Sequence, residues 1–323
     1  MKQVIDVSII VELENCSAHV NEFQDNLLSQ LLPINDQIAE IDYQVEVLVC
    51  FTRDAIDEEL LENSKNLCLQ SMPQTQLKFL SFNCAGYYEL KNYAADYCRG
   101  NIIIFLDSDV SPNQDWLKQL LEPFEKNKDI KVIAGRTELN AKNRLQRGQQ
   151  LVTFFDNFKE VTPIDSVNTF FANNAAFKKE IFLSHKFPVD QHSARSSCVQ
   201  LSNMLAKNNI PIWKQHEAVV HHRAVTTLSE LFIRCMAEGR DYVVCHDHRH
   251  PSIFKRAYLP IKLYKQKLRL VLNNLKQTSN SYNQTPMPWV SILIAYSYVH
   301  LLLMSSALTL IFPKIMRSIF LKI

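Results

Sequence analysis

Glycine is scarce in this chain, with 5 among its 323 residues. Proteins that bind phosphates through glycine-rich loops need several glycines in a short stretch, and neither a Walker-type loop nor a dinucleotide-binding G-x-G-x-x-G pattern is present. Closely paired cysteines are also missing: the 8 cysteines contain no C-x-x-C pair, which argues against a zinc site. The formal net charge is only +2. No strongly basic field indicates a nucleic acid partner.

The N-terminal segment lacks the features of a secretory signal peptide. Residues 1–11 contain one lysine, an acid at Asp6 and a short apolar run that is typical of a strand. We therefore expect reduced cysteines, as in a cytosolic protein, with a disulfide-bearing external domain as the alternative. The length allows one large domain with an appendage, or two modest domains.

Strand-like and helix-like patterns alternate along the first third of the chain. Strands are predicted at residues 4–11, 43–51, 77–82 and 102–106. Helices are predicted between them, at residues 20–32, 56–69 and 87–98, with Pro33 ending the first. This alternation predicts an α/β fold with a mainly parallel sheet flanked by helices. Ligands are expected beyond the carboxyl ends of its strands.

The alternation becomes less regular after Asp109. Helices are predicted at residues 116–124, 146–158, 199–207 and 228–244. Strands are predicted at residues 130–137, 210–213 and 218–221, and a strand or loop at residues 169–177.

The C-terminal part has a different composition. Residues 246–276 are rich in Lys and Arg, and residues 289–312 form a run without a formal charge. A bilayer core needs about 20 apolar residues, so this run predicts a hydrophobic membrane-anchor helix. We expect a main domain at residues 1–245, a basic juxtamembrane segment and linker at residues 246–288, and the anchor at residues 289–323. Basic residues before the run favour a cytoplasmic main domain. A helix in the membrane plane and a buried core helix are the alternatives.

Two acids follow the last strand of the alternating region. Residues 102–109 read I-I-I-F-L-D-S-D, which places Asp107 and Asp109 at the edge where an α/β sheet binds its ligand. Carboxylate oxygens suit Mg²⁺ or Mn²⁺, whose other positions a diphosphate can fill. A lone D-x-D is common and is often a solvated turn, so its place after a buried strand is what points to a metal site.

The run N-Y-A-A-D-Y-C-R-G-N-I-I-I-F-L-D-S-D at residues 92–109 resembles the family 2 glycosyltransferases. Further matches are V-S-I-I-V at residues 7–11, W-L at 116–117, N-N-A-A-F at 173–177 and E-A-V-V-H-H at 217–222. The resemblance extends over roughly residues 4–245. It implies a GT-A fold, a nucleotide-sugar donor, a divalent metal ion and inversion at the anomeric carbon.

The resemblance also implies roles for single residues. Asp107 would face the ribose or the metal, Asp109 would bind the metal, and His222 matches a late histidine near the diphosphate or metal. Donor or acceptor contacts are predicted for Glu12, Asn15, Asp54, Lys91 and Asn174. Ordinary alternatives are a surface histidine for His222, a turn-capping asparagine for Asn174, and a polar loop for Glu12 and Asn15.

The sequence departs from the family pattern at the catalytic base. An inverting transferase needs a carboxylate that takes the proton of the acceptor hydroxyl, and the family supplies it as Glu-Asp before a helix. Residues 195–201 read R-S-S-C-V-Q-L and contain no acid. Asp190 and His192 are the nearest replacements, so we predict that one of them is the base.

These observations predict a metal-dependent glycosyltransferase that acts on a lipid-linked or polysaccharide acceptor. The acceptor class rests on the membrane segment alone. One alternative is an inactive nucleotide-sugar-binding or scaffold protein of the same fold. Another is a nucleotidyltransferase, which would need a glycine-rich basic loop that residues 12–15 do not supply.

Overall fold

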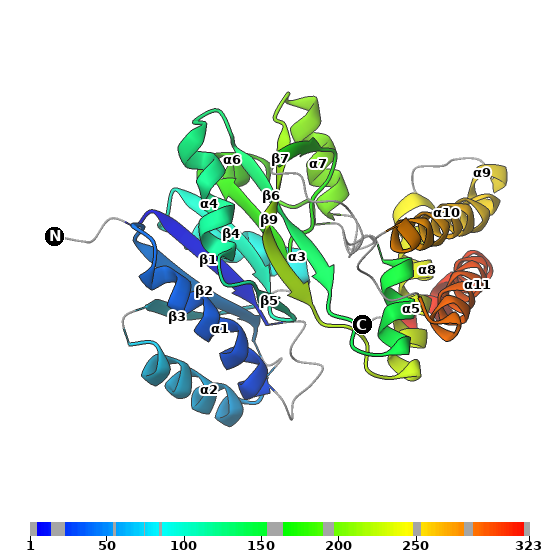
Figure 1. Ribbon diagram of the computed structural model, residues 1–323, viewed down its shortest axis with the longest axis horizontal. Helices are drawn as coiled ribbons and strands as arrows, with labels where there is room; N and C mark the ends of the chain where they lie inside the picture. Colours follow the sequence, from blue (N-terminus) through cyan, green and yellow to red (C-terminus); the bar gives the residue numbers. More distant parts are fainter. Residues whose placement is uncertain are drawn as a thin grey trace. The chain divides into compact units, whose positions relative to one another are not determined.

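A computed structural model describes residues 5–13, 23–53, 56–73, 75–83, 86–153, 164–189, 197–247, 253–280 and 287–319. The chain divides into two compact units (Figure 1). Unit 1 consists of residues 1–138, 161–189 and 196–222, and unit 2 of residues 139–160, 190–195 and 223–323.

Unit 1 is built on one sheet with the strand order β3-β2-β1-β4-β8-β6-β9-β5, and β7 pairs with β9. The strands are β1 (Val7–Glu12), β2 (Val45–Thr52), β3 (Gln76–Phe82), β4 (Ile102–Asp107), β5 (Val110–Pro112), β6 (Val132–Leu139), β7 (Ile164–Val167), β8 (Asn174–Lys178) and β9 (Ile212–His222). The neighbours β3, β2, β1 and β4 are parallel, whereas β4 and β8 are antiparallel. The predicted α/β fold with a central parallel sheet is therefore confirmed, with antiparallel strands added on one side.

Helices cover both faces of this sheet. They are α1 (Phe23–Ala39), α2 (Glu58–Ser71), α3 (Tyr87–Asp96), α4 (Trp116–Lys126), α6 (Lys179–His185) and α7 (Ser197–Lys207). Successive strand residues point to opposite faces, so β4 contributes to two cores. Ile104 and Leu106 pack with α1, α2 and α4 in one core. Ile103 and Phe105 pack with α3, α6 and α7 in the other.

Some predicted element boundaries are wrong. Helix α1 continues through Pro33 to Ala39, although proline removes one backbone donor from a helix interior. Leu27, Leu31 and Ile34 all lie in one core, so burial of this apolar face favours a continuous helix. The two short strands predicted at residues 210–213 and 218–221 are parts of a single strand, β9. Lys214 and Gln215, which lie between the predicted strands, pair with β7 and continue the strand.

Unit 2 is helical. Its described helices are α5 (Arg144–Val152), α8 (Leu228–Asp247), α9 (Ile253–Ala257), α10 (Leu259–Asn280), α11 (Trp289–Ile311) and α12 (Pro313–Ile319). They share a core that contains Leu151, Cys235, Val271 and Leu302. The predicted boundary at residue 245 falls within α8. The three predicted segments otherwise remain a prediction. Helix α11 is the described helix long and apolar enough to cross a membrane.

Candidate active site

The carboxyl ends of two parallel strands bring the first candidate residues together. Glu12 ends β1 and Asp107 ends β4, and the two residues are register partners in the sheet. Both are buried. Like charges this close need compensating donors, because burial of an unpaired carboxylate is unfavourable.

Helix α3 supplies those donors to Asp107. The Lys91 ammonium lies 2.8 Å from Asp107 Oδ1, and the Tyr87 hydroxyl donates to the same oxygen at 2.5 Å. Lys91 is fully buried and also donates to the carbonyl of Ala172 at 3.3 Å. The Gln30 amide donates to the backbone carbonyl of Asp107. The side chain and backbone of Asp107 are therefore held by three residues.

The ionisation of this group favours a charged pair. Burial alone would lower the pKa of Lys91, but the neighbouring Asp107 and Glu12 raise it above its ordinary value. Burial, with Asp107 beside it, raises the pKa of Tyr87 well above its ordinary value. Lys91 is thus an ammonium and Tyr87 a neutral phenol at neutral pH, and both act as donors.

Asp109 has different partners, on the antiparallel side of the sheet. Strand β5 begins at Val110, and Val110 pairs with His222 at the end of β9. His222 Nε2 lies 3.2 Å from Asp109 Oδ2. The other oxygen of Asp109, Oδ1, is buried and has no hydrogen-bond partner among the described residues. Such an oxygen beside an imidazole is a donor set that suits a divalent cation.

The predicted metal ligands are only partly brought together. Among the described residues, no three His, Cys, Asp or Glu side chains are grouped closely enough to hold a metal ion. Asp109 and His222 are adjacent, whereas Asp107 Oδ1 is bound to Lys91 and Tyr87. Of the three predicted metal ligands, the structure therefore brings only Asp109 and His222 into contact with each other.

Two predicted donor-binding residues are bound within the protein. Lys91 holds Asp107, as described above. Asn174 is buried, and its amide donates to the carbonyls of Arg136 (3.0 Å) and Ala218 (2.9 Å). Its oxygen accepts from the Trp116 indole at 2.9 Å. These contacts join β8 to β6, β9 and α4, which favours a structural role for Asn174.

Four predicted residues lie outside the described ranges: Asn15, Asp54, Asp190 and His192. Their roles stay predictions.

Sequence reasoning missed Tyr87 and Gln30. Tyr87 lies one helical turn before Lys91 on α3, and that spacing places both side chains on the same helix face. Gln30 could not be found from spacing, because its contact with Asp107 spans 77 residues of sequence.

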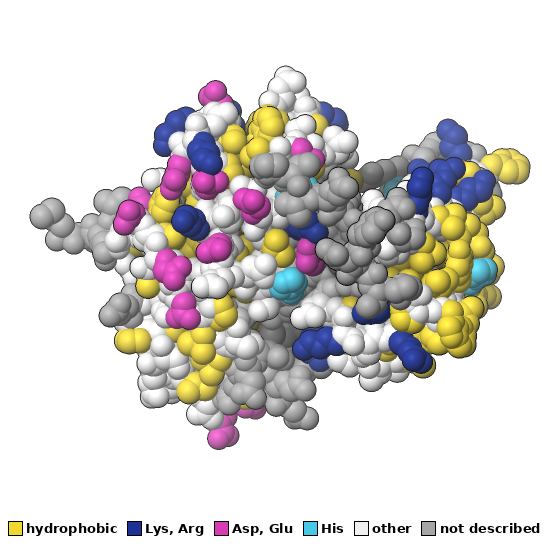
Figure 2. Space-filling model, in the orientation of Figure 1, with side chains coloured by type: hydrophobic (Ala, Val, Ile, Leu, Met, Phe, Trp, Pro, Cys, Tyr) yellow, Lys and Arg dark blue, Asp and Glu magenta, His cyan; other side chains and the backbone are white. Residues whose placement is uncertain are grey.

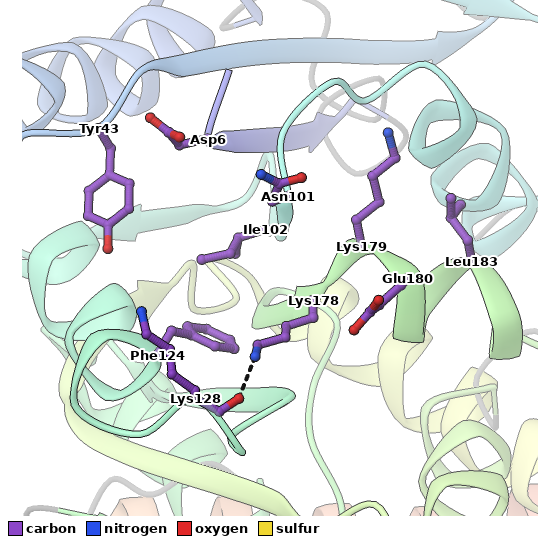
Figure 3. A pocket seen from close by; sticks show the side chains of 10 residues that line it. All are labelled: Asp6, Tyr43, Asn101, Ile102, Phe124, Lys128, Lys178, Lys179, Glu180 and Leu183. Atoms are coloured by element: carbon purple, nitrogen blue, oxygen red, sulfur yellow. Dashed lines mark hydrogen bonds between the residues drawn. The ribbon is translucent and has the colours of Figure 1, made fainter. Parts of the chain in front are cut away.

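A cavity of about 630 Å³ lies at the opposite edge of the sheet (Figure 3). Asp6 precedes β1 and Ile102 begins β4, so the cavity is lined by the amino ends of these strands. Lys178 in its wall donates to the carbonyl of Lys128. Since α/β sheets bind ligands at the carboxyl ends of their parallel strands, this cavity is not the predicted donor site.

The sequence matches a family of known proteins. The sequence model described as "Glycosyl transferase family 2" matches residues 21–185, more than half of the chain. The chain has no significant match among curated proteins.

Several solved structures are similar to this chain, and the first of them shares its fold. One is the mannosyltransferase PcManGT from Pyrobaculum calidifontis in complex with GDP-Man and Mn²⁺, with a TM-score of 0.57 and 16% identity over 97% of this chain and 89% of that chain. S. aureus TarS 1-349 gives a TM-score of 0.49 and 15% identity over 93% of this chain and 81% of that chain. A mycobacterial protein gives 0.47 and 15% over 75% of this chain and 74% of that chain. At 16% identity the similarity to PcManGT concerns the fold alone.

Proposed function

The chain belongs to glycosyltransferase family 2, and we propose that it transfers a sugar from a nucleotide-sugar donor with the help of Mg²⁺ or Mn²⁺. We propose inversion at the anomeric carbon and a lipid-linked or polysaccharide acceptor. The observation that carries the metal site is the buried Asp109 Oδ1, which has no hydrogen-bond partner among the described residues and lies next to the Asp109–His222 contact. A similar fold has been solved with GDP-Man and Mn²⁺, which supports this donor class and cation.

The residues at the carboxyl ends of these strands have separate proposed roles. Asp109 and His222 would hold the cation, which when bound offsets negative charge on the departing nucleoside diphosphate. Lys91 and Tyr87 both bind Oδ1 of Asp107. The two donors thus hold one oxygen of this carboxylate, and the other is Oδ2. We propose that this second oxygen contacts the donor's ribose or the metal.

Asp190 or His192 is the proposed base that accepts the proton of the acceptor hydroxyl. Asp190→Asn and His192→Ala are each tested for sugar transfer and, separately, for donor binding. We expect the variant that lacks the base to bind donor normally and to lose at least about 100-fold in transfer. If both variants retain full transfer, neither residue is the base.

We also propose that the protein is associated with a membrane, with unit 1 facing the cytoplasm. The length and apolar composition of α11 support the association. The excess of basic residues before this helix supports the orientation.

Thermal stabilisation by nucleotide sugars tests the donor and metal proposals together. A panel of nucleoside diphosphate sugars is screened with and without Mn²⁺, and each hit is then assayed for donor hydrolysis. At 100 times its Kd a ligand stabilises the folded state by about 2.7 kcal/mol. We expect Asp109→Asn to lose the Mn²⁺-dependent part of this gain. Asp129→Asn, a change at an exposed acid after α4, serves as the matched control.

Two results would contradict these proposals. Mn²⁺-dependent stabilisation that survives in Asp109→Asn would remove the metal site from Asp109. Donor binding without hydrolysis or transfer to any acceptor would favour the alternative of a nucleotide-sugar-binding scaffold.

A further inference from the structure

Helix α11 has two different faces. One face is buried in the core of unit 2 and includes Ala295, Tyr298, Val299 and Leu302. The other is exposed at positions separated by three, four or seven residues: Trp289, Leu293, Ser297, His300, Met304 and Ile311. These positions follow the helical period and form one stripe along the helix. A helix that crossed a bilayer alone would not need a packed face.

The packed face of α11 contacts α8 and α5 closely. A Cβ atom at Gly239 of α8 would lie 2.8 Å from Ser305 Cβ, and one at Gly148 of α5 would lie 2.6 Å from Ile294 Cγ2. The hydroxyl of Ser305 donates to the carbonyl of Met236 at 2.6 Å. Such contacts fix α11 within the helical unit. If α11 entered a membrane, α5 and α8 would therefore have to enter it as well.

Those neighbouring helices carry charges that are held inside unit 2. Lys267 of α10 is almost fully buried, and its ammonium lies 2.7 Å from Glu238 of α8. Tyr298 of α11 donates to the same glutamate at 2.7 Å. Crossing of a membrane by α11 would carry this charged group into the hydrocarbon layer, which is energetically costly. Immersion of the exposed stripe alone would leave these charges in place.

Apolar side chains are exposed on the adjacent elements as well. Phe254 of α9 is 88% exposed and Trp289 of α11 is 71% exposed. Tyr258, Ile261 and Leu272 on or beside α10 are also exposed. Figure 2 shows hydrophobic side chains gathered over the part of unit 2 that α10 and α11 form, with Lys and Arg side chains beside them.

The C-terminal segment, residues 248–323, carries formal charges of one sign only. Residues 248–323 contain 11 Lys and Arg and no Asp or Glu, whereas residues 1–247 contain the other 24 basic residues and all 33 acidic residues. Lys255, Lys262, Lys265 and Arg269 are exposed. Basic side chains next to an exposed apolar face are complementary to an anionic lipid surface, where the headgroups attract Lys and Arg and the acyl region takes up apolar groups.

We infer that unit 2 docks on an anionic membrane surface with α11 parallel to the membrane plane, through the stripe of α11 and the basic residues of α9 and α10. This refines the membrane association proposed above and does not depend on sugar transfer. It replaces a spanning helix by a reversible contact that responds to lipid charge and to salt.

Sedimentation of the full-length protein with vesicles tests the contact. We expect binding to phosphatidylcholine vesicles that contain phosphatidylglycerol, and about tenfold weaker binding to pure phosphatidylcholine vesicles or in 0.5 M salt, because the headgroup charge is removed or screened. The stripe variant Leu293→Glu/Met304→Glu and the charge variant Lys262→Glu/Lys265→Glu/Arg269→Glu should each bind about tenfold less.

Matched controls keep the comparison specific. Leu69→Glu/Val199→Glu changes two exposed apolar residues of unit 1, and Lys126→Glu/Lys128→Glu/Lys207→Glu changes three exposed lysines there. Both controls should bind vesicles like the unchanged protein. Circular dichroism and thermal unfolding confirm that every variant is folded.

Depth-dependent quenching by brominated lipids separates an in-plane helix from a spanning one. The tryptophan variants are Leu293→Trp, Ser297→Trp and Ile311→Trp, and the signal of the unchanged protein is subtracted. A helix in the membrane plane predicts equal quenching of all three by lipids brominated near the headgroup. A spanning helix predicts that Ser297→Trp, near the middle of α11, is quenched mainly by deeply brominated lipids.

Three outcomes would overturn the inference. Deep quenching at Ser297→Trp would show that α11 spans the membrane. Equal binding to neutral and anionic vesicles would remove the role of the basic residues. A third outcome is that the unchanged protein does not bind vesicles and is a dimer, whereas the stripe variant is a monomer. This would show that the stripe contacts a second copy of the chain. Donor hydrolysis measured without vesicles is unaffected by these outcomes, so the proposed function is judged separately.

Discussion

At the scale of single residues, the candidate site depends on a buried ion pair rather than on exposed charges. Lys91 and Asp107 are both almost completely shielded from water, and their atoms are 2.8 Å apart. The removal of one partner from a buried pair leaves the other charge without compensation, which costs about 3–5 kcal/mol. We propose that Lys91 positions Asp107 through this ion pair, whereas the donor contact that the family resemblance implied for Lys91 stays a prediction.

Lys91→Met should lower the free energy of unfolding by about 3 kcal/mol, because the Asp107 carboxylate then stays buried without its counter-charge. Urea denaturation measures this loss. Lys65→Met, which removes an exposed pair with Glu62 on α2, is the matched control and should change stability by less than about 1 kcal/mol. Adding Asp107→Asn to Lys91→Met should recover part of the loss. Equal effects of Lys91→Met and Lys65→Met would contradict a coupled pair.

At the scale of elements, the buried carboxylate of Glu46 connects the start of β2 to β1, to β3 and to the turn before β4. Glu46 Oε1 accepts from the Ser8 hydroxyl and the backbone N–H of Arg99, both at 2.7 Å. Its other oxygen accepts from Lys78 (2.9 Å) and Arg99 Nε (2.8 Å). Burial alone would raise the pKa of Glu46, but these donors outweigh it and lower the pKa to about 2.

This shift predicts an acid-sensitive term in stability. A carboxylate whose pKa is lowered by folding stabilises the folded state fully above its unfolded pKa, near 4.5, and loses that contribution as the pH falls towards 2. Its full contribution corresponds to about 3 kcal/mol. Urea unfolding between pH 6 and pH 3 should show a shallower pH dependence for Glu46→Gln than for the unchanged protein. Parallel profiles would show that Glu46 has an ordinary pKa.

The turn between α3 and β4 brings backbone very close to β1. A Cβ atom at Gly100 would lie 2.6 Å from the backbone nitrogen of Ser8, whereas one at Gly86, before α3, would have nothing within 4 Å. Gly100→Ala should therefore cost about 1–3 kcal/mol, because two backbone segments must separate. Gly86→Ala is the control and should cost less than about 1 kcal/mol. Thermal unfolding of both variants checks this, and equal losses would contradict the close approach.

The sequence predicts elements better than it predicts partners. The apolar run at residues 102–106 and the helical pattern at residues 87–98 correspond to β4 and α3, because burial on both faces of a strand and on one face of a helix leaves a local pattern. Pro33 misled the prediction since the packing of α1 outweighs the loss of one hydrogen bond. The contact between Asp109 and His222 joins residues more than 100 positions apart. Only the resemblance to the family suggested that they meet.

At the scale of the whole molecule, charged residues are distributed unevenly between the two units. The acids and His222 of the candidate site belong to unit 1, whereas the acid-free basic segment belongs to unit 2. A donor with Mn²⁺ and an anionic vesicle should therefore act on different parts of the same chain. Hydrogen exchange read by mass spectrometry can distinguish these parts, because a ligand slows the local opening of the elements that it contacts.

Donor and Mn²⁺ should slow exchange in peptides from the ends of β4 and β9, where Asp107, Asp109 and His222 lie, and leave α10 and α11 unchanged. Phosphatidylglycerol vesicles should slow exchange in α10 and α11 and leave β4 and β9 unchanged. Asp109→Asn serves as the control for the first effect, and Leu293→Glu/Met304→Glu for the second. Protection of α11 by the donor would show instead that the two units respond together. Membrane contact would then be linked to donor binding, and by reciprocity vesicles would change the donor's affinity.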